Sequence, residues 1–238
     1  MEREKMASQL KIHCVYTPAH EVLYRDWFLP SMPAGIEVVA ELLPISGAGD
    51  FLSEEFLRCI RAKMDRVARS IEENPGEWIV WSDVDILMSA AVKREVEAVV
   101  AVAGKNRIFF QRETRAPGEV NTGFILMHCG PLTAGFFREV ASRLDAEREK
   151  NEQAVINEML MEANTISWGY LPVEFVARTH GWPPRVPMVI YHANYTVGAH
   201  AIAQKTRQFR HVRRMQRWGL PAVAWAVLTR AWEKMRGV

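Results

Sequence analysis

The sequence predicts an α/β protein in which helices pack on a mainly parallel sheet. Short apolar segments of strand character alternate along the chain with longer segments in which apolar residues recur every three or four positions. Proline and glycine separate many of these segments and mark their ends. Strands that alternate with helices in this way form a layered α/β fold.

The amino-terminal half contains the clearest individual elements. Apolar residues at Phe56, Ile60 and Met64 continue with the same spacing to Ile71, which predicts a long amphipathic helix. The run Glu77-Trp78-Ile79-Val80-Trp81 is short, apolar and bounded by turn residues, as expected of a buried central strand. We predict strands over residues 10–17, 36–43 and 77–81, and helices over residues 21–29, 51–73 and 90–102.

The carboxy-terminal half continues the alternation and ends in a basic tail. We predict strands over residues 107–111, 121–128 and 188–192, and a largely helical segment over residues 132–160. From residue 205 onward, nine lysines and arginines stand against Glu233 alone, so this tail carries a charge of +8 and the rest of the chain −6. We therefore divide the chain into one globular domain over residues 1–205 and a basic helical tail over residues 206–238.

Composition and hydropathy exclude several classes of protein. The 238 residues are 49% hydrophobic and 24% charged, which suits one globular domain. No apolar run approaches the length of about 20 residues that spans a bilayer. The N-terminal run Met1-Glu2-Arg3-Glu4-Lys5 lacks the apolar stretch of a secretion signal, so we expect a soluble, cytoplasmic protein. The cysteines lie too far apart for a disulfide framework or a zinc motif; they are Cys14, Cys59 and Cys129.

The strongest local feature is Asp83-Val84-Asp85, directly after the predicted strand that ends at Trp81. Side chains two residues apart on an extended segment point the same way, so both carboxylates can face one site. In open α/β sheets, ligands bind beyond the carboxyl ends of the strands. Two close carboxylates repel each other unless they share a cation, and oxygen ligands favour Mg²⁺ or Mn²⁺. A solvated acidic turn is the alternative, but the buried strand leading into the pair favours a metal site.

A second polar cluster begins at His192, where the last predicted strand ends. A neutral imidazole at this position can complete the coordination of a metal ion. Gly198 allows close approach of the backbone to a ligand, and Lys205 can pair with phosphate oxygens. Taken alone, His192 is more often a hydrogen-bonded structural histidine and Lys205 a part of the basic tail. The functional interpretation therefore depends on the other motifs.

Seven short motifs stand in one order along residues 11–209 of the chain. They are Tyr16-Thr17, Lys63, Trp81-Ser82-Asp83-Val84-Asp85, Asn121-Thr122-Gly123-Phe124, Glu152-Gln153, Leu171-Pro172 before Phe175, and His192-Ala193-Asn194 with Gly198 and Lys205. In this order they resemble the nucleotide-diphospho-sugar transferase superfamily, the GT-A glycosyltransferases, and most of all its retaining branches. The resemblance implies a Rossmann-like, GT-A type α/β/α sandwich around a mixed sheet, with residues 1–205 as the catalytic domain.

The resemblance also implies which residues act. Asp83, Asp85 and His192 would bind Mn²⁺ or Mg²⁺, with Asp83 also close to the ribose of the nucleotide. Glu152 and Gln153 would lie near the anomeric carbon and the acceptor, although the family more often has Asp where Glu152 stands. The residues that would contact the nucleotide-sugar are Tyr16, Thr17, Lys63, Asp83, Asn121, Thr122, Gly123, Asn194, Gly198 and Lys205.

The implied function is transfer of a sugar from a UDP- or GDP-sugar to a hydroxyl of a glycan, a lipid-linked acceptor or a protein, with retention of configuration. A catalytically inactive nucleotide-sugar-binding or scaffold protein of the same fold is the alternative. A protein without catalysis has no need for this set of residues, which argues against the alternative. The set is Asp83, Asp85, His192 and Lys205. An aspartyl phosphatase also has Asp-x-Asp after a strand, but Leu87 stands where such enzymes usually have Thr or Val.

The basic tail permits two main interpretations. Residues 220–232 read as a mostly apolar helix that is too short to span a membrane. This helix can rest on anionic lipid and bring the protein peripherally to a membrane, or it can dock on the domain and leave the arginines solvated. We expect no nucleic-acid partner, because the body is acidic and no nucleic-acid-binding module is recognised. Trp168 and Trp182 are either core residues or a stacking surface for the acceptor.

Overall fold

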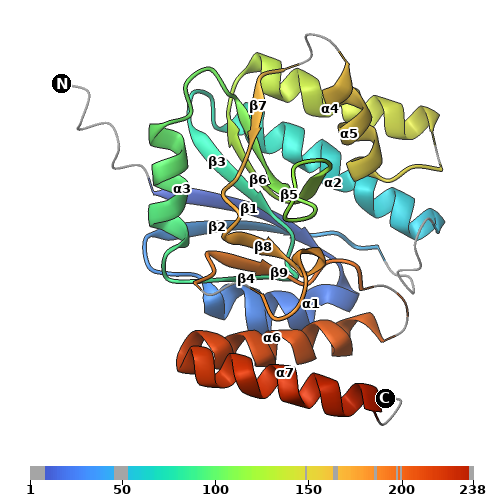
Figure 1. Ribbon diagram of the computed structural model, residues 1–238. Coiled ribbons are helices and arrows are strands. Elements are labelled where there is room, and N and C mark those ends of the chain that lie inside the picture. Colours follow the sequence, from blue (N-terminus) through green and yellow to red (C-terminus); the bar gives the residue numbers. More distant parts are fainter. Residues whose placement is uncertain are drawn as a thin grey trace.

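The computed structural model describes residues 9–45, 53–147, 149–162, 166–184, 187–196, 198 and 200–235. These residues form a layered α/β fold with a six-stranded mixed sheet flanked by helices (Figure 1). A smaller three-stranded sheet lies next to it, on the side of the carboxy-terminal helices. The predicted α/β sandwich around a mixed sheet is confirmed.

The large sheet has the strand order β2-β1-β3-β6-β5-β7. β1 pairs in parallel with β2 and β3, and β7 pairs in parallel with β5. β6 pairs antiparallel with both β3 and β5, which makes the sheet mixed. The strands are β1 (Leu10–Tyr16), β2 (Ile36–Leu42), β3 (Trp78–Ser82), β5 (Ile108–Arg112), β6 (Val120–His128) and β7 (Trp168–Tyr170).

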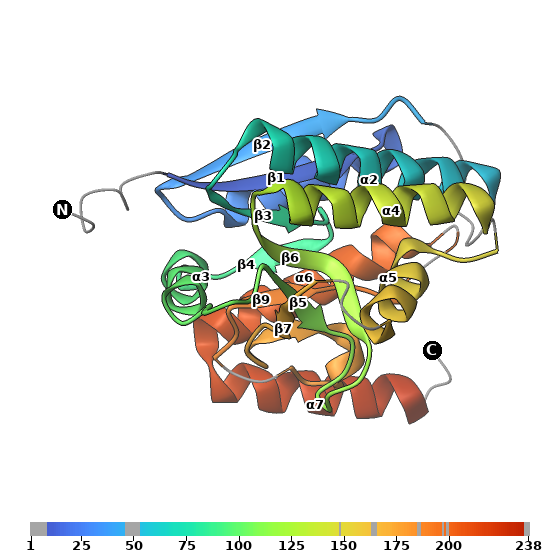
Figure 2. The ribbon, with the colours of Figure 1, turned by 90° about the horizontal axis from the view of Figure 1, so that it is seen from above.

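Side chains that alternate along β3 divide the core between the two faces of this sheet. Ile79 and Trp81 pack on one face with helices α2 (Glu54–Glu73) and α4 (Pro131–Ala146). Val80 packs on the other face with the residues of α3 (Val92–Ala101). Figure 2 shows α2 and α4 side by side along their face, with α3 away from them. Both faces of β3 are therefore buried, as its apolar sequence predicts.

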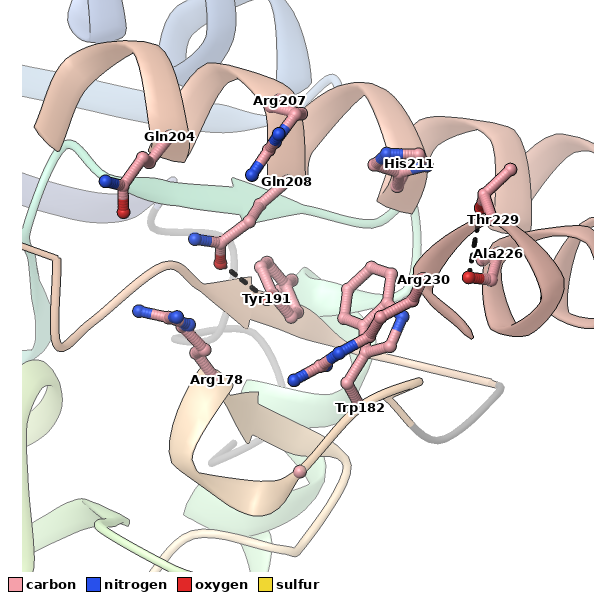
Figure 3. A pocket seen from close by; sticks show the side chains of 11 residues that line it. Arg178, Trp182, Tyr191, Gln204, Arg207, Gln208, His211, Ala226, Thr229 and Arg230 are labelled. Atoms are coloured by element: carbon pink, nitrogen blue, oxygen red, sulfur yellow. Dashed lines mark hydrogen bonds between the residues drawn. The ribbon is translucent and has the colours of Figure 1, made fainter. Parts of the chain in front are cut away.

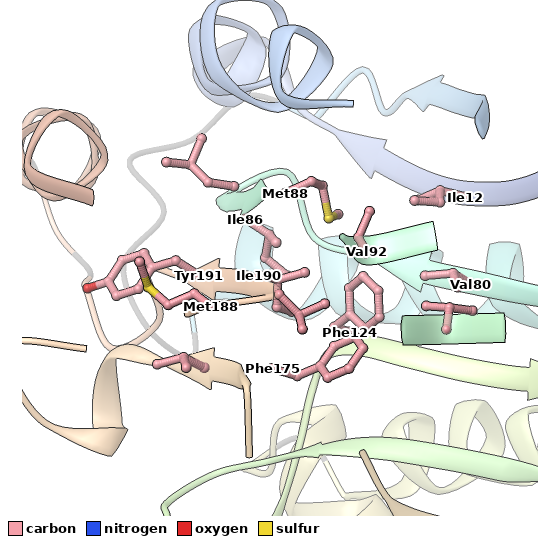
Figure 4. Packing of buried hydrophobic residues seen from close by; sticks show 14 of the residues in the cluster. Ile12, Val80, Ile86, Met88, Val92, Phe124, Phe175, Met188, Ile190 and Tyr191 are labelled. Carbon is pink, nitrogen blue, oxygen red and sulfur yellow. The ribbon is translucent and has the colours of Figure 1, made fainter. Parts of the chain in front are cut away.

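The small sheet has β9 (Ile190–His192) between β4 (Ile86–Met88) and β8 (Phe175–Ala177). β9 pairs antiparallel with β4 and parallel with β8. The small sheet packs against the large one through Phe175 of β8 and Phe124 of β6, whose ring centroids lie 5.5 Å apart (Figure 4). This packing joins β8 to β6, and β9 lies beside β8 in the small sheet.

Several elements differ from the prediction. β4, β7 and β8 were not predicted, because three residues are too few to display a period. The strand predicted from residue 188 begins at Ile190, and the helical segment 132–160 is two helices, α4 and α5 (Glu152–Met161). The segment predicted as one helix over 21–29 is helical but lies within a run of short helical turns: η2 (Pro18–His20), α1 (Glu21–Leu23), η3 (Tyr24–Phe28) and η4 (Leu29–Ser31).

Helix α2 begins at Glu54 because the Ser53 hydroxyl accepts a hydrogen bond from the backbone N–H of Phe56. The helix was predicted from residue 51, and residues 51–52 lie outside the described residues, as does the glycine-rich turn predicted at 47–49. Helix α5 begins in the same way after Asn151, whose side chain accepts from the backbone N–H of Ala154 at 2.8 Å.

The basic tail forms two helices, α6 (Ala201–Trp218) and α7 (Leu220–Met235), joined at Gly219. They lie side by side along one side of the molecule (Figure 1). α6 docks on the core through Phe209, Val212 and Met215, which are fully buried. It also runs through residue 205, so the domain boundary predicted there falls within a helix, and the division into domain and tail stays a prediction. Among the described helices, none is both long and apolar enough to cross a bilayer.

Candidate functional site

Asp83, Asp85 and His192 come together at the end of β3. One ligand atom from each lies within 4.8 Å of the others, as in a site for a single metal ion. The acidic pair directly follows β3, and His192 reaches it because β9 pairs with β4, the next strand along the chain. The backbone N–H of Ala193 also donates to the carbonyl of Asp85 at 3.0 Å. One antiparallel strand pair thus brings together residues that lie more than a hundred positions apart in the sequence.

Gln111 orients the imidazole of His192. The Nδ1 atom of His192 lies 2.9 Å from Gln111 Oε1, and the Gln111 amide nitrogen donates to the carbonyl of Phe175 at 3.2 Å. The amide oxygen of Gln111 therefore faces the ring, and Nδ1 carries the proton that it accepts. This leaves Nε2, which lies 3.3 Å from Asp85 Oδ1, as the atom that can bind a metal. Sequence reasoning missed Gln111, which it treated only as the end of a strand.

Gly123 leaves the space that His192 occupies. A Cβ atom at this position would lie 2.1 Å from Cε1 of the His192 ring and 2.9 Å from Nε2. Both distances are shorter than carbon and nitrogen atoms can approach without a bond. The carbonyl of Gly123 also accepts from the backbone N–H of Asp83 at 2.7 Å. The glycine predicted to contact the nucleotide-sugar is therefore next to the metal cluster.

Each of the two aspartates has its own lysine. Lys63 Nζ lies 2.8 Å from Asp83 Oδ1 and 3.0 Å from Glu152 Oε1, and Lys205 forms an ion pair with Asp85 Oδ2. Both lysine side chains are almost completely buried, at 9% and 10% exposed. Buried ammonium groups need carboxylate partners of this kind, because they have lost their water.

These contacts shift the pKa values in opposite directions. Burial raises the pKa of Asp83 above its ordinary value, with repulsion from Asp85 adding to it and Lys63 opposing it. Burial also favours protonation of Asp85, but Lys205 and His192 outweigh it and hold the pKa of that carboxyl well below its usual range. Burial lowers the pKa of Lys63, but Asp83 and Glu152 raise it above its ordinary value. Asp85 and Lys63 therefore stay charged at neutral pH.

Glu113 forms hydrogen bonds with three of the predicted site residues. Its carboxylate accepts from the side-chain amides of Asn121 at 2.6 Å, Gln153 at 3.1 Å and Asn194 at 3.1 Å. The carboxylate is buried, and these amides come from β6, from α5 and from the segment after β9. Sequence reasoning missed Glu113, because a single acidic residue after a strand has no local signature.

Glu152 lies between the metal cluster and this amide group. Besides its ion pair with Lys63, its Oε1 atom accepts from the Thr122 hydroxyl at 3.3 Å. Asn121 in turn accepts from the backbone N–H of Gly123 at 2.9 Å. The predicted catalytic pair Glu152-Gln153 is therefore connected to Asp83 through Lys63, to Thr122 directly, and to Asn121 through Glu113.

The remaining predicted residues border the site less directly. Tyr16 ends β1 and stacks on Tyr24 with ring centroids 4.2 Å apart, while the Thr17 hydroxyl lies 2.9 Å from Nδ1 of His20. Burial and then Lys205 lower the pKa of His20, with Asp85 and Asp83 opposing, so this segment lies near the cluster. Gly198 precedes α6 with a φ of 86°, and it makes none of the contacts described above.

A family model described as nucleotide-diphospho-sugar transferase matches residues 64–208, more than half of the chain. The match contains both aspartates, Glu152, His192 and Lys205. The chain belongs to this family. It is therefore a glycosyltransferase by family, and the alternative of a scaffold without catalysis is not favoured. No curated protein matches the chain in a search of full sequences.

Solved structures of other glycosyltransferases have the same fold as this transferase. A glycosyltransferase involved in glycosylation of the major capsid of PBCV-1 matches with a TM-score of 0.62 and 15% identity, over 83% of this chain and 98% of that one. The galactosyltransferase LgtC, in complex with donor and acceptor sugar analogs, matches with a TM-score of 0.54 and 12% identity, over 84% and 95%. GlyE from Streptococcus pneumoniae TIGR4 matches with a TM-score of 0.52 and 11% identity, over 85% and 60%.

Proposed function

We propose that this transferase moves a sugar from a UDP- or GDP-sugar to an acceptor hydroxyl, depends on Mn²⁺ or Mg²⁺, and retains the configuration at the anomeric carbon. The observation that supports the proposal best is the convergence of Asp83, Asp85 and His192 within 4.8 Å. Two carboxylates and an imidazole form a ligand set that accepts either cation. When bound, the ion would offset the charge that develops on the departing diphosphate.

The lysines supply fixed positive charge at the same place. Lys205 lies beside Asp85, and its ammonium could pair with phosphate oxygens of a donor bound there through the metal ion. Lys63 holds Asp83 and Glu152 at a fixed separation, because one ammonium contacts both carboxylates. Charges that are positioned before the substrate arrives stabilise developing charge without reorganisation.

Glu152 and Gln153 are proposed to face the anomeric carbon and the acceptor. Glu152 contacts the ammonium of Lys63 and the hydroxyl of Thr122, so its carboxylate is held in place. An ionised carboxylate near the anomeric carbon can steady an oxocarbenium-like centre. Glu113 acts indirectly, as a positioning residue for Asn121, Gln153 and Asn194.

The tail supports a peripheral membrane contact and a lipid-linked acceptor. Helix α7 packs on α6 but leaves large apolar side chains in solvent, including Trp225, Leu228 and Trp232, which are 52–66% exposed. Trp218 and Leu220 at the junction are 63% and 79% exposed, close to the arginines of α6. Aromatic residues beside basic ones bind anionic lipid surfaces. Docking of α6 and lipid contact by α7 are compatible, so both interpretations of the tail can hold together.

The proposed function is tested by release of free sugar and nucleotide from a panel of UDP- and GDP-sugars with and without Mn²⁺. We expect metal-dependent hydrolysis for at least one donor, and a rise in melting temperature with that donor and metal together. Asp85→Ala should abolish both effects. The matched control is Asp145→Ala, which removes an exposed ion pair with Arg61 on the helical face of the large sheet. Unchanged metal-dependent binding and hydrolysis in Asp85→Ala would refute the metal site.

A further inference from the structure

A cavity of about 360 Å³ lies between the small sheet and the carboxy-terminal helices. Tyr191 of β9 lines it, and since side chains alternate along a strand, Tyr191 points away from the face on which His192 meets the acidic pair. The cavity is therefore separate from the candidate metal site, and none of Asp83, Asp85 and His192 lines it. Its walls are Arg178, Gly181, Trp182, Tyr191, Gln204, Arg207, Gln208, His211, Ala226, Thr229 and Arg230.

Three arginines of this cavity come from three different elements: Arg178 from η5 (Arg178–His180), Arg207 from α6 and Arg230 from α7. Among the side chains that the structure describes, no carboxylate lies within ion-pair distance of these guanidinium groups. Figure 3 shows the Arg230 side chain reaching from α7 past Trp182 toward the side of the cavity that Arg178 borders. Three guanidinium groups without a carboxylate partner among the described side chains make the cavity suited to an anion.

Two hydrogen bonds fix the orientation of the donors in this cavity. The Tyr191 hydroxyl donates to Gln208 Oε1 at 2.8 Å, which leaves the amide N–H groups of Gln208 as its free donors (Figure 3). Nη1 of Arg178 donates to the carbonyl of Tyr195 at 2.8 Å and to the Thr196 hydroxyl at 3.1 Å. The guanidinium plane is thereby held in place while its other N–H groups remain available.

Burial raises the pKa of Tyr191, although Arg178 and Arg230 act in the opposite direction. Both arginines are therefore close enough to the buried phenol for their charges to be felt there. Trp182 stands edge-on to Tyr191 with ring centroids 6.5 Å apart, and it provides an apolar wall next to the charged groups. The cavity thus combines cationic donors with an aromatic surface.

We propose that this cavity is a second ligand site that binds a phosphate group, held by Arg178, Arg207 and Arg230 with help from Gln208. A carboxylate presents only two oxygens, whereas a phosphate presents three or more, and three separate guanidinium groups match the larger number. The remainder of the ligand would lie against Trp182. The phosphate belongs either to a small soluble phosphomonoester or to a lipid headgroup, since both offer the same group to the arginines.

Titration calorimetry of the full chain in EDTA tests the site, with inorganic phosphate and glycerol 3-phosphate as soluble probes. Co-sedimentation with phosphatidylcholine vesicles, with and without phosphatidic acid, tests the lipid source. We expect one of the two sources to bind, and Arg178→Gln, Arg207→Gln and Arg230→Gln each to weaken that binding about tenfold or more. The matched control is Arg210→Gln, which removes the same charge from an exposed position of α6 outside the cavity. It should leave binding within about twofold.

The proposal would be overturned if neither phosphate source bound. It would also be overturned by an equal loss in Arg210→Gln and the cavity variants, since that would reflect general charge attraction. The same titration of Asp85→Ala separates this site from the proposed sugar transfer. Binding that persists in that variant locates the phosphate away from the acidic pair, whereas its loss assigns the phosphate to the acidic pair and refutes the second site.

Discussion

His192 reaches the acidic pair through the space that Gly123 leaves open. Substitution of this glycine should therefore disturb the site even when the new side chain is small. Gly123→Ala should displace the imidazole, because the added methyl group would lie 2.1 Å from Cε1 of His192. We expect Mn²⁺ affinity to fall by about 10- to 100-fold, as when a partner of a metal ligand is lost. Mn²⁺ titration by calorimetry measures this effect.

Gly135→Ala is the matched control for that variant. An added methyl group on this exposed residue of α4 meets nothing within 4 Å, and alanine favours a helix over glycine by about 0.5–1 kcal/mol. It should therefore raise the melting temperature slightly and leave Mn²⁺ affinity unchanged. Equal Mn²⁺ affinity in both variants would mean that His192 is not a ligand.

Gln111 provides a second prediction for the same histidine. Gln111→Leu removes the acceptor that holds the proton on Nδ1, so the ring is free to rotate or to protonate Nε2 instead. We expect Mn²⁺ affinity to fall by about 10- to 100-fold. Gln111→Glu keeps an acceptor at the same position and should retain more of the affinity. An identical loss in the two variants would show that the position matters for packing and not for the tautomer.

The sequence predicted the ligand candidates but not the residues that hold them. Asp83 and Asp85 are adjacent to a recognisable strand, and His192 ends another, so local pattern and resemblance together identify them. Gln111 and Glu113 contact His192 and Asn194, in both pairs 81 positions away along the chain. Such partners follow from the packing of two sheets, which no local pattern encodes.

At the scale of single elements, the start of α5 matters most, because Glu152 and Gln153 are its first two residues. Asn151→Ala removes the hydrogen bond to the backbone N–H of Ala154. We expect the free energy of unfolding to fall by about 1 kcal/mol and the rate of donor hydrolysis to fall further than the loss of folded protein explains. Urea denaturation and initial rates measure the two effects.

Ser53→Ala is the matched control, since it removes the equivalent bond at the start of α2, ten residues before Lys63. It should cost a similar free energy of unfolding and leave the rate per folded molecule unchanged. If Asn151→Ala changes the rate no more than Ser53→Ala does, the beginning of α5 does not position the site.

The predictability of an element follows its length. The twenty residues of α2 contain several repeats of the helical period, and both ends are marked by residues that begin or stop a helix. β4 and β8 have three residues each and show no period, yet they position Asp85 and His192. The antiparallel direction of β6 was equally hidden, because an apolar strand reads the same in either direction.

At the scale of the whole molecule, His13 couples stability to pH. It lies on β1, is only 2% exposed, and burial followed by the charge of Arg66 lowers its pKa to about 4. In the unfolded chain the pKa returns to about 6.5, so the unfolded state binds the proton first as pH falls. The contribution of His13 to the free energy of unfolding is complete above pH 6.5. It is lost between pH 6.5 and 4, at up to about 1.4 kcal/mol per pH unit.

His13→Leu should remove this part of the pH dependence. We expect the difference in unfolding free energy between pH 7 and pH 5 to be smaller in the variant than in the unchanged chain, as measured by urea denaturation at both values. An identical difference in the two proteins would contradict the assignment, because other histidines would then account for all of the dependence.

The buried ion pairs of Lys63 and Lys205 also have a consequence for the order in which ligands arrive. The site has three carboxylates and these two lysines, so it carries one net negative charge when all five groups are ionised. The carboxylates are those of Asp83, Asp85 and Glu152. A diphosphate approaching this site is repelled, whereas a divalent cation is attracted and reverses the sign. We therefore expect compulsory addition of metal before donor: a nucleotide-sugar alone should bind weakly by calorimetry, and the same donor after Mn²⁺ should bind tightly.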